Sequence, residues 1–176
     1  SFKPKNKIYL DKFSKKLCGK NRKGHFEGVL NVVNRLLEII KPKHIFLGIK
    51  DFQQLYLINR HIKMKNIQTK VISCKIIREI NGVACSTRNK NLNKKNLLLA
   101  SKIYKYFKLK KKLIKKSYNE YNIFDIKKDL LKLGLQKIDY IEMLNINTLK
   151  KIKKKSENYK IFIAYYINKI RLIDNI

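Results

Sequence analysis

The sequence predicts an α/β half with a parallel sheet, followed by a smaller α+β half. In the first half, strand-like and helical patterns alternate within about thirty residues, which is the order of a βαβ unit. In the second half, two helical patterns precede three strand-like segments, which is typical of an α+β unit. We place the boundary near Lys75, where the pattern changes.

An amphipathic helix is expected to begin near Phe26 and to end at Lys41-Pro42. Its apolar residues recur at the i, i+3, i+4 and i+7 spacing of one helix face, which should be buried: Val29, Val32, Val33, Leu36, Leu37 and Ile40. The apolar run Ile45-Phe46-Leu47 follows and stops at Gly48, which is typical of a buried parallel strand.

A second helix and a second strand complete the βαβ unit. Asp51 is placed to cap this helix, whose buried stripe should be Leu55, Ile58 and Ile62, and a strand is expected over residues 67–74. Parallel strands place their ligands beyond their carboxyl ends, which is where residues 48–54 lie. A glycine permits close backbone approach, a helix N-terminus favours anions, and the lysine that follows adds positive charge.

The second half is expected to contain two helices and three strands. One helix carries its apolar residues at Leu97, Leu98, Ile103, Tyr104 and Phe107. The other spans residues 123–133, with Gly134 as its stop, and the strands are expected over residues 137–144, 160–167 and 171–173.

A second polar segment lies about thirty residues after residues 48–54. Ser86-Thr87-Arg88-Asn89 offers two hydroxyls and a guanidinium, which suit a polyphosphate. Cys85, directly before it, is expected to be a small buried residue, and a catalytic thiol is the weaker interpretation. Two separated phosphate-type segments predict a nucleotide enzyme.

Composition limits the cellular setting. With 44% hydrophobic residues, the 176-residue chain can form a core. No apolar run approaches the roughly twenty residues of a spanning helix, so a soluble intracellular protein is expected. The three cysteines are an odd number without C-x-x-C spacing, which indicates reduced thiols rather than a disulfide framework or a zinc site.

The net charge of +31 is typical of a nucleic-acid-binding protein. The lysines, however, are spread through every segment together with Ile and Asn, as codon drift in an AT-rich genome would produce. The densest runs, residues 108–116 and 150–155, lie between helix-like and strand-like segments and are interpreted as solvated linkers and faces. A basic module that binds RNA or another polyanion stays an alternative.

Five blocks of sequence together resemble one enzyme family. Residues 48–54 are similar to a family pattern GEKDFQQ, and residues 86–89 are similar to the pattern SSRN. Residues 22–29 resemble RPGHF-x-GV, residues 78–82 resemble RE-x-DG, and residues 171–175 read RLIDN. The chain thus resembles the pantothenate synthetase (pantoate–beta-alanine ligase) family over nearly its whole length.

The resemblance implies a fold and an activity. Residues 1–75 would form the second half of a Rossmann-like nucleotidyltransferase-type domain with a parallel sheet, and residues 76–176 a small α+β C-terminal domain that carries the second ATP-binding loop. The implied reaction is ATP-dependent condensation of pantoate with beta-alanine through pantoyl adenylate, with release of AMP and pyrophosphate. ATP and Mg²⁺ would be its cofactors, and a cytoplasmic homodimer its form, with no specific nucleic acid and no membrane.

The resemblance also implies roles for residues, and it implies no metal ligands. Gly48, Ile49, Lys50 and Asp51 would bind ATP, with Lys50 as the catalytic residue that stabilises phosphate charge. Gln54 would hydrogen-bond pantoate. A second ATP-binding set would be Ile77 through its backbone, together with Cys85, Ser86, Thr87 and Arg88.

Several positions depart from the family pattern. Ile49 replaces a glutamate, Lys23 a proline and Thr87 a serine. A His-x-Gly-His motif, which the family uses on ATP phosphates, is absent, because no pair among His25, His44 and His61 has that spacing. We therefore expect that the chain is the C-terminal part of a longer enzyme and is inactive alone. The alternative is an inert remnant of that enzyme. Asp174 and Asn175 are expected to serve packing.

Overall fold

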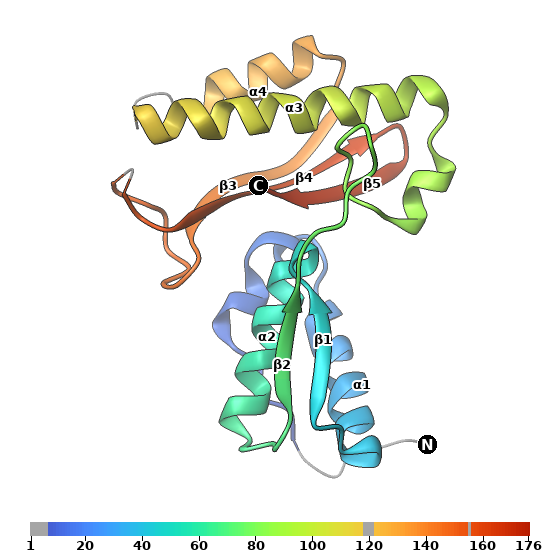
Figure 1. Ribbon diagram of the computed structural model, residues 1–176, viewed down its shortest axis with the longest axis vertical. Helices are drawn as coiled ribbons and strands as arrows, with labels where there is room; N and C mark the ends of the chain where they lie inside the picture. Colours follow the sequence, from blue (N-terminus) through green and yellow to red (C-terminus); the bar gives the residue numbers. More distant parts are fainter. Residues whose placement is uncertain (1–6, 118–121, 155) are drawn as a thin grey trace. The chain divides into compact units, whose positions relative to one another are not determined.

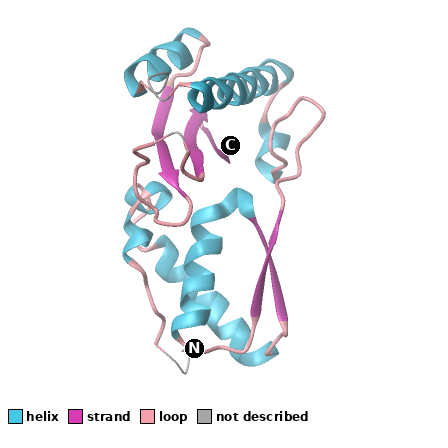
Figure 2. Ribbon diagram, turned by 60° about the vertical axis from the view of Figure 1, so that its left-hand side comes forward, coloured by secondary structure: helices cyan, strands magenta, loops and turns pink. Residues whose placement is uncertain are grey.

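Two separate sheets organise the chain, as the computed structural model in Figure 1 and Figure 2 shows. The structure describes residues 7–117, 122–154 and 156–176. The chain divides between Lys75 and Ile76 into two compact units, which we call the N-terminal and the C-terminal unit.

Among its described residues, the N-terminal unit contains two α-helices and a pair of parallel strands. Its elements are η1 (Lys12–Lys15), η2 (Leu17–Lys20), α1 (His25–Ile40), β1 (His44–Gly48), η3 (Ile49–Asp51), α2 (Phe52–Met64) and β2 (Lys70–Cys74), where η marks a short 3₁₀ turn. β1 and β2 pair in register from His44 opposite Lys70 to Gly48 opposite Cys74. A helix therefore connects two parallel strands, as the alternating pattern predicts.

The core of this unit lies between the two helices and one face of the strand pair. Leu30 and Leu37 from α1 pack with Ile58 and Ile62 from α2, and partly buried side chains of the strands complete the cluster: Ile45, Leu47 and Val71. The same face of α2 thus covers both α1 and the strands.

The predicted burial of α1 and β1 is wrong in part. Val32, Leu36 and Ile40 are exposed, because the covered face of α1 runs through Phe26, Leu30 and Leu37 and is narrower than the apolar arc in the sequence. β1 was expected to be buried, but its side chains alternate and Phe46 is 69% exposed. Only one face of the described strand pair is covered by helices of this unit.

β2 begins at Lys70, three residues later than the predicted start at residue 67. Residues 65–69 instead turn the chain at the end of α2, since Asn66 has a left-handed φ of 50° and the Ile67 N–H donates to the Ile62 carbonyl. The Thr69 hydroxyl then donates to the Pro42 carbonyl at 2.7 Å.

The C-terminal unit is an antiparallel sheet with two helices. Its elements are η4 (Thr87–Asn91), α3 (Lys94–Lys116), α4 (Ile123–Lys132), β3 (Lys137–Asn145), β4 (Tyr159–Ile167) and β5 (Ile170–Asn175). The strand order is β3-β4-β5. Side chains from α3, α4 and β4 form one core that includes Ile103, Phe107, Ile126, Leu130 and Ile161, so both helices lie on the same face of the sheet (Figure 1).

The interpretation of residues 108–116 as a linker is wrong, because they continue α3 to Lys116. Phe107 and Ile114 lie two helical turns apart and are both fully buried, which fixes this stretch on the sheet. Most lysines of the stretch are exposed, whereas Lys110 and Lys111 are half-buried. Residues 150–154 do lie in the connection between β3 and β4, whereas Lys155 falls outside the described residues.

The predicted stop of α4 is confirmed. Gly134 has a φ of 100°, a left-handed conformation that glycine adopts without strain, and the Leu135 N–H donates to the Leu130 carbonyl. Within the described ranges, no helix combines the length and the apolar character needed to cross a bilayer.

Candidate nucleotide site

The first candidate loop is the corner between β1 and α2. Gly48 ends β1 in an extended conformation, and the 3₁₀ turn Ile49–Asp51 leads directly into α2. Ile49 and Lys50 are half-buried, while Gly48 and Asp51 are exposed. This corner lies at the carboxyl end of a parallel strand and at the N-terminus of a helix, a position where backbone N–H groups favour an anion.

The expected capping role of Asp51 is not observed. Asp51 occupies the N-cap position of α2, yet its side chain makes no capping hydrogen bond. The preceding 3₁₀ turn sets its backbone to φ −90° and ψ 51°, outside the extended region that capping residues usually adopt. The carboxylate is therefore exposed beside Lys50 rather than turned back on the helix.

The two adjacent glutamines of this corner have different surroundings. Gln53 is buried, and its side-chain oxygen accepts a hydrogen bond from the Cys18 N–H at 3.0 Å. Its side-chain nitrogen donates to the Phe13 and Lys16 carbonyls at 2.7 and 2.6 Å. Gln53 thus fastens the η1–η2 segment to α2, whereas the Gln54 side chain is only half-buried.

A buried histidine network supports the helices behind this corner. The His61 Nδ1 accepts from the Tyr9 N–H at 3.0 Å, and the Nε2 lies 2.9 Å from the Asn34 Oδ1. The Asn34 amide donates in turn to Glu38 at 3.0 Å. Burial, with a smaller contribution from Lys65, lowers the pKa of His61, and Glu38 opposes this shift. The network holds a neutral imidazole and serves packing.

The second candidate loop follows a hairpin in the C-terminal unit. Arg78 and Ala84 form an antiparallel bridge, and the Cys85 N–H donates to the Ile77 carbonyl at 2.9 Å. The Ser86 hydroxyl accepts from the Arg88 N–H at 3.3 Å and caps η4. Side chains of the residues that follow Ser86 reach solvent, so a hydroxyl and a guanidinium are presented together: Thr87 and Arg88.

Cys85 is exposed, which corrects the expectation of a buried residue. The buried positions are taken by its neighbours Val83 and Ala84, with 6% and 5% exposure, so the next residue of the hairpin faces outward. The Ile77 side chain is likewise 75% exposed, and its carbonyl is used in the hairpin.

Two contacts in this unit were not anticipated from the sequence. Arg78 donates two hydrogen bonds to Asp174, at 2.7 and 2.9 Å, across 96 residues of chain. The Asn89 side-chain nitrogen donates to Glu79 at 2.7 Å and to the Ala84 carbonyl at 3.1 Å. The Arg78–Asp174 ion pair could have been suspected from the opposite charges in two sequence blocks, residues 78–82 and 171–175.

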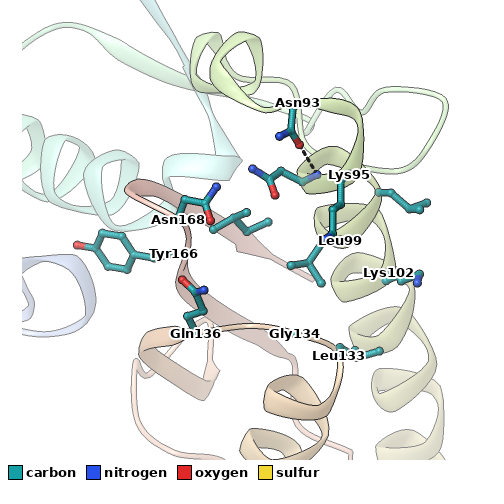
Figure 3. A pocket seen from close by; sticks show the side chains of 12 residues that line it. Asn93, Lys95, Leu99, Lys102, Leu133, Gly134, Gln136, Tyr166 and Asn168 are labelled. Carbon is teal, nitrogen blue, oxygen red and sulfur yellow. Dashed lines mark hydrogen bonds between the residues drawn. The ribbon is translucent and has the colours of Figure 1, made fainter.

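Each unit also contains a cavity. In the N-terminal unit, a cavity of about 420 Å³ is lined by residues 22–24 together with Phe26 and Glu27. In the C-terminal unit, one of about 640 Å³ lies between the start of α3, the end of α4 and the β4–β5 turn (Figure 3). Lys95, Lys102 and Asn168 contribute to its wall. Neither cavity is lined by Lys50 or Arg88.

The predicted site residues fall into two sets. Gly48, Ile49, Lys50, Asp51 and Gln54 belong to the N-terminal unit, whereas Ile77 and residues 85–88 belong to the C-terminal unit. Within the described part of the chain, no group of three or more His, Cys, Asp or Glu side chains is arranged to hold a metal ion.

The fold and the loops define a two-unit α/β protein with a parallel strand pair and a separate antiparallel sheet. The chain belongs to the pantoate-beta-alanine ligase family, whose sequence model matches residues 2–176. The resemblance seen in the five sequence blocks is therefore confirmed.

Curated relatives carry the name pantothenate synthetase. The protein of Flavobacterium psychrophilum is 40% identical over 161 residues, which cover 90% of this chain and 57% of that protein. The protein of Caldicellulosiruptor bescii is 36% identical over 174 residues, covering 98% of this chain and 62% of that protein. The chain thus spans about three-fifths of the length of these relatives.

Solved structures agree in fold. A pantothenate synthetase from Thermus thermophilus superposes with a TM-score of 0.86 at 23% identity, over 97% of this chain and 63% of that one. A pantoate-beta-alanine ligase from Francisella tularensis, complexed with beta-gamma ATP and beta-alanine, superposes with a TM-score of 0.73 at 34% identity, over 100% of this chain and 58% of that one. The prediction of an α/β fold with a parallel sheet is confirmed.

Proposed function

We propose that this chain is part of an ATP-dependent ligase that condenses pantoate with beta-alanine. The observation that carries the proposal is the family match over residues 2–176, with the Gly48–Gln54 block at the carboxyl end of a parallel strand. In the proposed reaction the pantoate carboxylate attacks the α-phosphorus of ATP and displaces pyrophosphate. The amine of beta-alanine then attacks the acyl carbon of pantoyl adenylate, and AMP leaves.

Both steps require control of charge rather than a covalent nucleophile on the protein. Negative charge grows on the phosphoryl oxygens and on the departing pyrophosphate, so fixed cations and N–H donors lower the barrier. In this proposal Lys50 supplies that charge from the β1–α2 corner, and the backbone of Gly48–Asp51 approaches the nucleotide. Gln54 holds pantoate, because an amide both donates and accepts hydrogen bonds.

A second set of ATP contacts is proposed for the loop in the C-terminal unit. Ser86, Thr87 and Arg88 are proposed to bind phosphate oxygens, and Ile77 and Cys85 to contribute backbone contacts. The exposure of Thr87 and Arg88 supports this role, since a free hydroxyl and a guanidinium suit phosphate geometry.

The site is also proposed to use Mg²⁺. The described residues offer no cluster of three metal-binding side chains, whereas Mg²⁺ is usually held by one or two carboxylates plus substrate phosphates. The exposed Asp51 beside Lys50 fits that arrangement, in which the ion would come with ATP and neutralise phosphate charge.

Further features of the proposal concern the protein as a whole. Residues 1–75 would represent part of a Rossmann-like domain, residues 76–176 the C-terminal domain, and the working form a cytoplasmic homodimer. No His-x-Gly-His motif is present in the 176 residues, so the full reaction is proposed to need a further polypeptide segment that supplies it.

Calorimetric titration with ATP and Mg²⁺ tests the nucleotide site directly. Hydrogen bonds to charged groups contribute about 1.5–3 kcal/mol, so Lys50→Ala should weaken binding by about tenfold or more. Lys43→Ala is the matched control, because Lys43 is an exposed lysine directly before β1, at the other end of the strand. The proposal would be overturned if Lys50→Ala and Lys43→Ala bound ATP equally well. It would also be overturned if ATP binding by wild type and both variants disappeared at moderate salt.

A further inference from the structure

The Arg78–Asp174 ion pair joins the hairpin that precedes the candidate loop to β5. The two hydrogen bonds are short and bidentate, at 2.7 and 2.9 Å, and the side chains are only 19% and 10% exposed. Burial alone would lower the pKa of Arg78, but the hydrogen bonds and charge of Asp174 more than offset it and raise the pKa above its usual value. The guanidinium is thus fixed on β5.

Arg78 also closes the turn of the hairpin. Its Nη1 donates to the Gly82 carbonyl at 3.0 Å, and the Gly82 N–H donates to the Glu79 carbonyl at 2.7 Å. The Arg78 Cζ lies 4.3 Å from the centre of the Tyr104 ring, and this ring fills the space where a Cβ of Gly82 would lie. One arginine therefore connects the hairpin turn to both β5 and α3.

The candidate loop is fastened to this hairpin at both of its ends. At the start, the Cys85 N–H donates to the Ile77 carbonyl at 2.9 Å. At the end, the buried Asn89 donates to the Glu79 carboxylate at 2.7 Å and to the Ala84 carbonyl at 3.1 Å. The three residues between Cys85 and Asn89 are the hydroxyl and guanidinium segment, so their place depends on the hairpin.

We propose that Arg78 and Asp174 are positioning residues for the Ser86–Arg88 segment: they fix the hairpin from which this segment extends, without touching the ligand themselves. The inference rests on the proposed function as far as ATP is concerned. A loop that is already held in its binding geometry loses less conformational entropy when the ligand binds. Loss of the ion pair should therefore weaken phosphate binding.

The same sheet offers a matched control pair. The Arg171 Nε donates to Asp139 at 2.7 Å, and these side chains are 17% and 8% exposed, nearly as in the first pair. This second pair joins β5 to β3 rather than to the hairpin of residues 78–84. Asp174→Asn and Asp139→Asn each remove the negative charge of a partly buried ion pair, and only the first of these pairs supports the loop.

The test measures two quantities on both variants at equal temperature. Hydrogen exchange of the Arg88 and Asn89 amides, which donate to the Ser86 hydroxyl and the Ser86 carbonyl, should become about tenfold faster in Asp174→Asn and stay unchanged in Asp139→Asn. The dissociation constant for ATP should rise about five- to tenfold in the first variant alone. Arg78→Lys, which keeps the charge but cannot form the bidentate contact, should give an intermediate result and serves if Asp174→Asn does not fold.

The exchange measurement separates this inference from the proposed function, because it needs no ligand. If wild type does not bind ATP but the loop exchanges faster only in Asp174→Asn, the positioning role holds and the nucleotide proposal fails. If the two aspartate variants change loop exchange and ATP affinity equally, the Arg78–Asp174 pair serves general stability and the inference is overturned.

Discussion

Replacement of Gln53 by methionine should destabilise the N-terminal unit by about 2–4 kcal/mol. The substitution keeps the volume of this buried side chain but removes its three hydrogen bonds to the backbone of the η1–η2 segment. An unsatisfied buried polar group costs about 1–3 kcal/mol. The Phe13 and Lys16 carbonyls each keep a second donor, the N–H groups of Lys16 and Gly19, so each loss lies at the lower end of that range.

Urea titration followed by circular dichroism measures this effect, with Gln54→Met as the adjacent control. Gln54 is half-buried, and no comparable set of backbone bonds among the described residues depends on it, so its substitution should change the free energy of unfolding by less than about 1 kcal/mol. Equal stability losses in the two variants would refute the structural role assigned to Gln53.

Three further predictions concern two titrating side chains and two glycines. Burial lowers the pKa of His61 below 6.5, so the unfolded chain is protonated at a higher pH than the folded chain, and the free energy of unfolding should fall as the pH drops below 6.5. His61→Gln should remove this dependence of the free energy of unfolding on pH, as measured by urea titrations on either side of pH 6.5. Burial and the nearby Lys160 lower the pKa of Lys111 to about 8, so its acylation, followed by peptide mass spectrometry, should have its midpoint about there; a midpoint near 10.5 would contradict this. Gly82 has a φ of 89° and faces a tyrosine ring, so Gly82→Ala should lower stability by about 2 kcal/mol, whereas Gly28→Ala on the open face of α1 should raise it by up to about 1 kcal/mol; thermal unfolding that shows the same sign for both would contradict the geometry.

Local patterns of the sequence predicted the order of the elements well. The apolar run before Gly48 predicted the position of β1, although Phe46 is exposed, and the stripe that contains Ile58 and Ile62 predicted α2 and its buried face. Gly134 marked the end of α4 through its left-handed φ. The lysine run at residues 108–116 misled, because charge dominated the composition while Phe107 and Ile114 kept the helical period.

Contacts between distant residues could not be predicted in the same way. Whether α1 buries Leu30 or Val32 depends on which neighbouring element covers it, and one sequence does not contain that information. Arg78 and Asp174 lie 96 residues apart in the sequence. The surroundings of Gln53 and Gln54 differ because α2 turns the first toward the η1–η2 segment. The assignment of Lys50 and of residues 85–88 to ATP stays a prediction.

An isotope experiment can follow oxygen from pantoate to AMP and so test both the proposed reaction and the role of Lys50. The chain is mixed with a polypeptide that carries the remaining part of a family member, and ATP, Mg²⁺, beta-alanine and pantoate labelled with ¹⁸O in its carboxylate are added. Attack of the carboxylate on the α-phosphorus transfers one labelled oxygen to AMP, so mass spectrometry should find labelled AMP with wild type and almost none with Lys50→Ala. AMP without label would contradict attack of the carboxylate on the α-phosphorus. Equal amounts of labelled AMP from wild type and Lys50→Ala would contradict the proposed role of Lys50.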